Sequence, residues 1–285
     1  MPVFSRRAFC AAAAELTAVG PLQAAQPRRE ASARLPRLGV QAGVVRSPLT
    51  ADFDGTLARL AALGYATIEL QWYSGNFGRT PAEIRRACEA AGLQVPSALI
   101  RAGTMLVGWQ RHLEASRAIG IETLAVVNLS DDEVQSIDDW REWADRFNEA
   151  GSVARRAGMW LALHNEPAFM QPIDGRVPYD VFLSHTDPAV VALSMDAANM
   201  VRGGADPLPY LHAHRERYRL GHLKDVAMDN TVGGVFGDGR VPLTQVITGL
   251  SAAASRLQFI EHPLTAGREF EDLERIQRRL ETLRA

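Results

Sequence analysis

Imidazole and carboxylate side chains follow four short apolar runs in the second half of the chain. The first run ends at His164, with Glu166 two residues later, and the next three lead into Asp196, His222 and Glu261. Such groups are costly to bury without a partner, because desolvation disfavours a lone charge. A shared divalent cation would remove that cost for all of them, so the pattern predicts a metal site.

The mixture of nitrogen and oxygen ligands narrows the choice of metal. Manganese, cobalt, zinc and iron accept imidazole together with carboxylate, whereas magnesium and calcium favour all-oxygen shells. We therefore predict one divalent metal (Mn, Co, Zn or Fe). Taken singly, each residue also has a structural interpretation, as a hydrogen-bonded core histidine or as a carboxylate that caps a helix. Their occurrence on four consecutive strands favours the metal site.

The elements that position these residues alternate along the chain. From residue 37 onward, short apolar runs are followed by longer amphipathic segments, which is typical of βα units. Eight such units predict a single (β/α)8 TIM barrel, whose functional residues lie at the carboxyl ends of the strands. The predicted strands cover residues 38–44, 66–70, 94–99, 123–127, 160–164, 190–195, 218–222 and 258–261, and the predicted helices cover 54–63, 80–92, 109–119, 138–157, 207–214, 243–254 and 269–283.

An open, doubly wound parallel sheet is the alternative fold. Such a sheet normally carries a glycine-rich GxGxxG turn after its first strand. Residues 41–46 read QAGVVR at this point, without that motif. The closed barrel is therefore favoured.

Composition and charge exclude several classes of protein. Of the 285 residues, 47% are hydrophobic and 22% are charged, and the net charge is -2, as in an ordinary globular domain. Because there is no basic excess to neutralise phosphates, we expect no nucleic-acid partner. The chain has 2 cysteines, Cys10 and Cys88, so we expect neither a disulfide framework nor a cysteine metal site, and Cys88 is interpreted as a buried hydrophobe.

The N-terminal segment resembles an export signal. Arg6 and Arg7 precede an apolar stretch over residues 10–19 and the small residues Ala24 and Ala25, which is the order found in twin-arginine signals. The stretch is too short to span a bilayer, which takes about 20 apolar residues. We predict a twin-arginine-type signal peptide and linker over residues 1–35, a periplasmic location, and one barrel domain over residues 36–285.

Several motifs are similar to those of a known family. The sequence GHLKD at 221–225 resembles the HxKD pattern of the sugar phosphate isomerase/epimerase group of xylose-isomerase-like TIM barrels. Four further stretches resemble motifs of the same family: MDAAN at 195–199, GGADP at 203–207, GDGRV at 237–241 and IE at 260–261. The similarity covers essentially the whole chain after the leader. The resemblance implies metal ligands at Asp196, His222 and Glu261, with a fourth from the strand predicted over 160–164.

The chain departs from the best-understood epimerases at this fourth ligand. Those enzymes carry a glutamate, which is both ligand and acid/base, at the position of His164. Related members carry a His-Asn-His stretch, to which HNE at 164–166 is similar. His164 and Glu166 are two residues apart, so both can face the barrel mouth. We predict His164 as the ligand and Glu166 as its rival or as an acid/base group.

The resemblance also implies enediolate chemistry. A metal that holds the carbonyl and neighbouring hydroxyl of a sugar acidifies the adjacent C–H, and a carboxylate removes the proton. Glu261 is the predicted acid/base, and Lys224 would stabilise the oxyanion or bind substrate. Alternatively, Lys224 is a surface lysine paired with Asp225. The predicted substrate contacts are Glu69, Trp72 and Asn199.

Three functions remain open. The favoured one is a metal-dependent isomerase or epimerase acting on a keto-sugar or related carbohydrate. A lyase or hydrolase acting on oxidised (keto) glycosides would use the same site, and loss of the glutamate at 164 favours it, because epimerisation ordinarily needs two acid/base groups. A non-catalytic carbohydrate-binding barrel is the third. An abasic-site endonuclease shares the barrel but needs more ligands and a basic face. The expected partner is a small carbohydrate. We expect no membrane span, and the sequence leaves open whether the protein forms a homo-oligomer.

Overall fold

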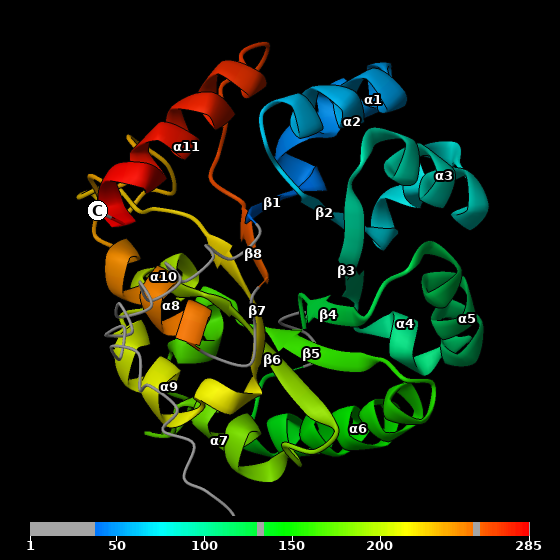
Figure 1. The fold of residues 1–285 in the computed structure, drawn as a ribbon. Helices are drawn as coiled ribbons and strands as arrows, with labels where there is room; N and C mark the ends of the chain where they lie inside the picture. The colour runs from blue at the N-terminus through cyan, green and yellow to red at the C-terminus, as the bar shows by residue number, and fades with distance from the viewer. Residues whose placement is uncertain (1–37, 130–133, 253–256, 285) are drawn as a thin grey trace, which may run out of the picture. The chain divides into compact units, whose positions relative to one another are not determined.

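The computed structural model describes residues 38–129, 134–252 and 257–284. Eight parallel strands form a closed barrel in sequence order, and β1 completes the ring by pairing with β8 as well as with β2 (Figure 1). The strands are β1 (Leu38–Gln41), β2 (Thr67–Gln71), β3 (Gln94–Arg101), β4 (Thr123–Val127), β5 (Trp160–His164), β6 (Val191–Asp196), β7 (Tyr218–Leu223) and β8 (Leu257–Ile260). The predicted (β/α)8 barrel is confirmed.

The helices surround the ring of strands (Figure 1). They are α1 (Arg46–Ala51), α2 (Phe53–Ala62), α3 (Pro81–Ala91), α4 (Gly103–Leu106), α5 (Trp109–Ile119), α6 (Ile137–Arg156), α7 (Pro178–His185), α8 (Ala197–Arg202), α9 (Pro207–Ala213), α10 (Leu243–Ala252) and α11 (Glu269–Arg284). A capping box begins α3, since Thr80 and Glu83 bond each other's backbone N–H groups, and Gly92 ends the helix in the left-handed conformation.

Short elements account for the differences from the predicted pattern. The first strand ends at Gln41 rather than at residue 44, because residues Ala42–Val45 form a 3-10 helix. The helices α1, α4, α7 and α8 are not in the predicted set. They have four to eight residues each, which is too few for an amphipathic repeat to stand out in the sequence.

Two layers of apolar side chains support the barrel. The larger layer lies between the strands and the helices and includes Cys88, which is buried as expected. A smaller cluster fills the inside of the barrel. It consists of short side chains and one aromatic ring: Leu99, Ala125, Val127, Ala162, Ala192, Leu220 and Phe259. Polar residues that are equally buried, among them Glu69, His164, Asp196 and His222, join this inner region at the strand ends.

The predicted signal peptide and linker, over residues 1–35, lie outside the described residues, so the export signal and the periplasmic location stay predictions. Within the described ranges, no helix combines the length and apolar character that a membrane crossing requires.

Candidate metal site and active-site cleft

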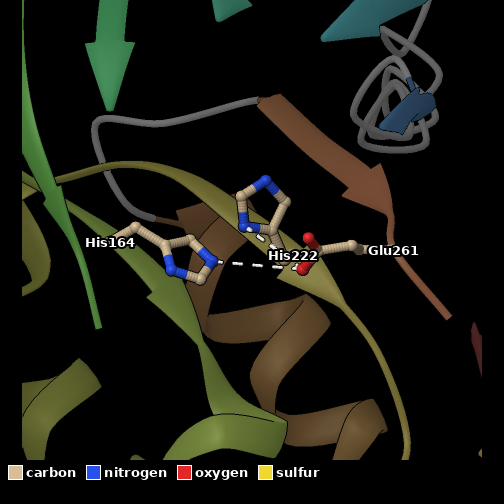
Figure 2. Close-up of side chains that lie close together, drawn as sticks. All are labelled: His164, His222 and Glu261. Atoms are coloured by element: carbon tan, nitrogen blue, oxygen red, sulfur yellow. Dashed lines mark ion pairs between the residues drawn. The ribbon is translucent and has the colours of Figure 1, made fainter. Parts of the chain in front are cut away.

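Three of the predicted ligands converge at the carboxyl end of the barrel. His164 ends β5, His222 lies on β7, and Glu261 follows β8 directly. One ligand atom from each lies within 4.8 Å of the others. Glu261 Oε2 is 4.0 Å from His164 Nε2 and 3.9 Å from His222 Nδ1, and both rings turn these nitrogens toward it (Figure 2).

Asp196, the fourth predicted ligand, borders the same cluster. Its Oδ1 accepts a hydrogen bond from the Asn199 N–H at 2.9 Å, so it caps α8. Its other oxygen, Oδ2, lies 3.9 Å from His164 Nε2. The helix-cap interpretation is therefore confirmed for Oδ1, while metal ligation through Oδ2 stays a prediction.

The donor atoms of this cluster fit a divalent cation. Both ring nitrogens of His164 and Nδ1 of His222 are buried without a hydrogen-bond partner. Buried polar atoms are normally satisfied, so such a group of nitrogens beside two carboxylates suits a shared metal. Metal binding itself stays a prediction.

Lys224 lies between the two carboxylates. Its Nζ is 2.7 Å from Asp196 Oδ2 and 2.9 Å from Glu261 Oε2. Burial would lower the pKa of the ammonium group, but these two carboxylates outweigh burial and hold that pKa above its ordinary value. The alternative interpretation, a surface lysine paired with Asp225, is wrong.

The other charges of the cluster are coupled to this lysine. Burial would raise the pKa of Glu261, but Lys224, His222 and His164 lower it to about 2. For His222, burial would lower the pKa, whereas the carboxylates of Glu69 and Glu261 raise it to about 9. Glu261 is therefore ionised at neutral pH, which is the form that accepts a proton.

A glutamate lies beside the outward nitrogen of each histidine. Glu166 Oε1 is 3.4 Å from His164 Nδ1, so Glu166 stands behind the ring rather than at the convergence point. Its Oε2 accepts a hydrogen bond from Asn199 Nδ2 at 3.1 Å. Of the two rival ligands at the end of β5, the geometry favours His164. On the other ring, Glu69 Oε2 lies 2.5 Å from His222 Nε2.

Of the three predicted substrate contacts, Glu69 and Asn199 are buried and hydrogen-bonded, and substrate contact by Trp72 stays a prediction. Glu69 is fully buried and both of its carboxylate oxygens are engaged within the barrel. The amide of Asn199 is committed to Glu166 and to the carbonyl of Asn165. Trp72 is half-buried and meets the ring of His112 edge-on. The geometry gives no support to substrate contact by Glu69 or Asn199, because neither has a free polar atom exposed at the mouth.

A cleft opens above the cluster and reaches Lys224 and Glu261. Its volume is about 520 Å³, which suits a small molecule of sugar size. The side chain of Glu261 is 18% exposed, so this carboxylate borders both the cluster and the solvent. The other residues that line the cleft are Gln41, Gly43, Val44, Arg46, Gln71, Val232, Pro263 and Leu264.

Asp225 has a task that sequence reasoning missed. Its buried carboxylate accepts hydrogen bonds from the N–H groups of Val226, Gly237, Gly239 and Val241, at 2.8 to 3.3 Å. The residue thereby fastens the segment from β7 to α10 beside the cleft. The signal was present in the paired motifs GHLKD and GDGRV, but only the fold shows that the aspartate of one binds the glycines of the other.

Among the other histidines, His185 and His212 are exposed and His214 is half-buried. His262 points away from Glu261, and its two ring nitrogens pair with the N–H of Asp225 and the carbonyl of Gly234.

Fold and site together define a class: parallel (β/α)8 barrels that gather imidazole and carboxylate groups at the carboxyl ends of their strands. The chain belongs to the xylose isomerase-like TIM barrel family, whose model matches residues 57–283.

Two relatives are named inosose dehydratase. The proteins from Geobacillus thermodenitrificans (strain NG80-2) and Geobacillus kaustophilus (strain HTA426) are each 24% identical to this chain, over 246 and 198 residues. The alignments cover 73% and 62% of this chain, and 80% and 63% of the two relatives.

Solved structures share the fold. A sugar phosphate isomerase/epimerase from Parabacteroides distasonis ATCC 8503 superposes with a TM-score of 0.73 at 22% identity, over 86% of this chain and 93% of that one. The IolI protein, whose structure contains a zinc atom, gives a TM-score of 0.65 at 14% identity, over 86% of this chain and 96% of IolI. At these identities the likeness establishes the fold alone.

Proposed function

We propose that this protein is a metal-dependent isomerase or epimerase that acts on a keto-sugar or related carbohydrate through an enediolate. One observation carries the proposal: buried imidazole nitrogens without partners meet two carboxylates below a cleft of sugar size. His164, Asp196, His222 and Glu261 would hold the ion, for which zinc, manganese, cobalt and iron are the candidates.

The residues around the cleft supply the remaining chemistry. A bound metal would polarise the sugar carbonyl and acidify the neighbouring C–H. Glu261, ionised and exposed at the floor of the cleft, accepts the proton from carbon. Lys224, within 3 Å of that carboxylate and also lining the cleft, offsets the negative charge that develops on the substrate oxygen.

A lyase that works on an oxidised carbohydrate is the second candidate. Glu261 is the carboxylate that lines the cleft, whereas Glu166 is held behind His164 by Asn199. One base at the cleft suffices to start an elimination, but epimerisation needs a second group on the opposite face of the carbon. The dehydratase names of the two Geobacillus relatives agree with this candidate.

Metal content is the first test. We expect about one transition metal per chain, by mass spectrometry of the purified protein, and its loss in the Asp196→Ala, His222→Ala double variant, because half of the ligand set is removed. The matched control is His212→Ala, which deletes an exposed histidine outside the cluster and should leave the metal in place.

Substrate turnover then separates the candidates. Incubation of the loaded protein with keto-sugars in deuterated water should give deuterium at the carbon beside the carbonyl. Recovery of an epimer or isomer supports the first candidate, and release of water or of a glycosidic leaving group supports the second. If the unaltered protein binds no metal even after reconstitution with manganese, cobalt, zinc or iron, both enzymes are excluded and a carbohydrate-binding barrel is left.

A further inference from the structure

A buried chain of polar side chains runs beneath the candidate metal site. Ser97 Oγ donates a hydrogen bond to Glu69 Oε1 at 2.7 Å, and Glu69 Oε2 lies 2.5 Å from His222 Nε2. The side chains of Glu69 and His222 are both 0% exposed. Such burial of a carboxylate is costly, and both of its oxygens are satisfied here.

The register of the barrel brings these three residues together. Glu69 on β2 and Ser97 on β3 are direct neighbours across the parallel ladder. His222 lies on β7, which reaches β2 only by way of β8 and β1. The side chain of Glu69 therefore reaches across the inside of the barrel, and its carboxylate contacts His222 on the opposite wall.

We propose that Glu69 is a positioning residue that keeps a proton on Nε2 of His222, so that Nδ1, which faces Glu261, is the nitrogen left to bind the metal. With the proton on Nδ1 instead, the lone pair of Nε2 would point at the carboxylate of Glu69, which is repulsive. Figure 2 shows the orientation of the ring, with Nδ1 of His222 facing Glu261 and the other ring nitrogen turned away. The proposal rests on the metal site of the proposed function, since Nδ1 is then the ligand atom.

The second histidine of the site is held differently. Its outward nitrogen, His164 Nδ1, is 3.4 Å from Glu166, whose side chain is 24% exposed and receives its other bond from a neutral amide. The contact between Glu69 and His222 is shorter and fully buried, so it is the one that restrains the orientation of its histidine ring. A carboxylate that bonds the outer nitrogen of a ligand histidine raises the basicity of the ligand and the affinity for metal.

Zinc affinity measures this role without relying on turnover. Competition with a chromophoric chelator should show a zinc affinity about 10- to 100-fold lower in Glu69→Gln, which keeps shape but removes charge. Ser97→Ala should give a smaller loss in the same direction, because it releases one oxygen of the glutamate. The control is Gln258→Leu on β8, which deletes the buried hydrogen bonds to Ile247 and Ser251 of α10 and should bind zinc within twofold of the unaltered protein.

Nitrogen-15 NMR of the metal-free protein gives an independent measure. We expect a far-downfield, slowly exchanging Nε2 proton at His222, which moves upfield in Glu69→Gln and partly in Ser97→Ala. Zinc affinities within twofold in both variants would overturn the proposal. If the unaltered protein binds none of zinc, manganese, cobalt and iron, the proposed function fails, and the ring proton alone decides on Glu69: an upfield move supports its positioning role and an unmoved signal refutes it.

Discussion

Lys224 compensates two carboxylates that the fold has placed in a region with little solvent. Asp196 is fully buried, Glu261 is 18% exposed, and the lysine side chain that joins them is 12% exposed. An isolated carboxylate pair in such surroundings would be strongly destabilising. At the scale of single residues, the ammonium group thus neutralises the same two acids that a bound metal would neutralise.

Replacement of Lys224 by methionine tests whether the ammonium group and a metal can compensate the same two carboxylates. In the metal-free protein we expect the free energy of unfolding to fall by about 3 kcal/mol, because breaking a buried pair leaves uncompensated charge. Saturating zinc should shrink the difference between variant and unaltered protein, since a ligand that binds the folded state stabilises it. Chemical denaturation with and without zinc measures both values. If Lys224→Met is destabilised by the same amount with and without zinc, the metal does not take over the role of the ammonium group.

The sequence predicts which residues meet at the site but not how they contact each other. His164, Asp196, His222 and Glu261 each end an apolar run, and a parallel barrel brings all such ends to one mouth. Their partners depend on the direction and reach of each side chain. Glu69 stands on β2, and nothing in its local sequence indicates that it crosses the barrel to β7.

Among the elements, the connection from β7 to α10 is fixed by one carboxylate. Gly239 lies so close to this carboxylate that an added Cβ would sit 2.3 Å from Asp225 Oδ1 and 2.3 Å from the carbonyl oxygen of Val226. The glycine is therefore required by space rather than by backbone angles. Any side chain at 239 must push the segment away from Asp225.

Gly239→Ala should consequently release this segment. We expect a loss of about 1–3 kcal/mol in the free energy of unfolding, because N–H donors that Asp225 satisfies lose their acceptor. Amide hydrogen exchange over residues 226–241 should become faster while the strands stay protected. Gly103→Ala is the control, since a Cβ there meets open space without a positive φ. Unchanged exchange at Gly237 and Val241 would refute this role of Asp225.

Element boundaries were predictable wherever the chain carries explicit end signals. The strands Thr123–Val127 and Trp160–His164 and the helix Trp109–Ile119 match the predicted ranges. The short helix α8 was missed because its first turn follows β6 without a loop, with Asp196 as the residue shared between them. A residue that serves as strand end, helix cap and predicted ligand gives no separate helix signal.

At the scale of the whole barrel, closure depends on a glycine in the first strand. Gly39 pairs with Thr67 of β2 on one side and Phe259 of β8 on the other. An added Cβ would lie 2.3 Å from Thr67 Oγ1 and 2.4 Å from Phe259 Cδ1. The seam between the first and last strands therefore has no room for a methyl group.

Gly39→Ala should strain the seam and lower the stability of the entire barrel. Overpacking of this kind costs about 1–3 kcal/mol, and we expect a loss in that range with the unfolding transition still cooperative. Thermal and urea unfolding followed by circular dichroism measure it, with Gly103→Ala again as the reference. A variant as stable as the unaltered protein would show that the strands around Gly39 accommodate a methyl group without loss of stability.

The same seam has a consequence for synthesis. β1 emerges from the ribosome first among the strands and β8 last, yet these two pair with each other. Until residues 257–260 are available, the nascent chain presents two open sheet edges with unpaired N–H and C=O groups, which invite pairing with other chains. Closure of the barrel must therefore wait until residues 257–260 have been synthesised, and the interval before that is when the exposed edges make the nascent chain most prone to aggregation.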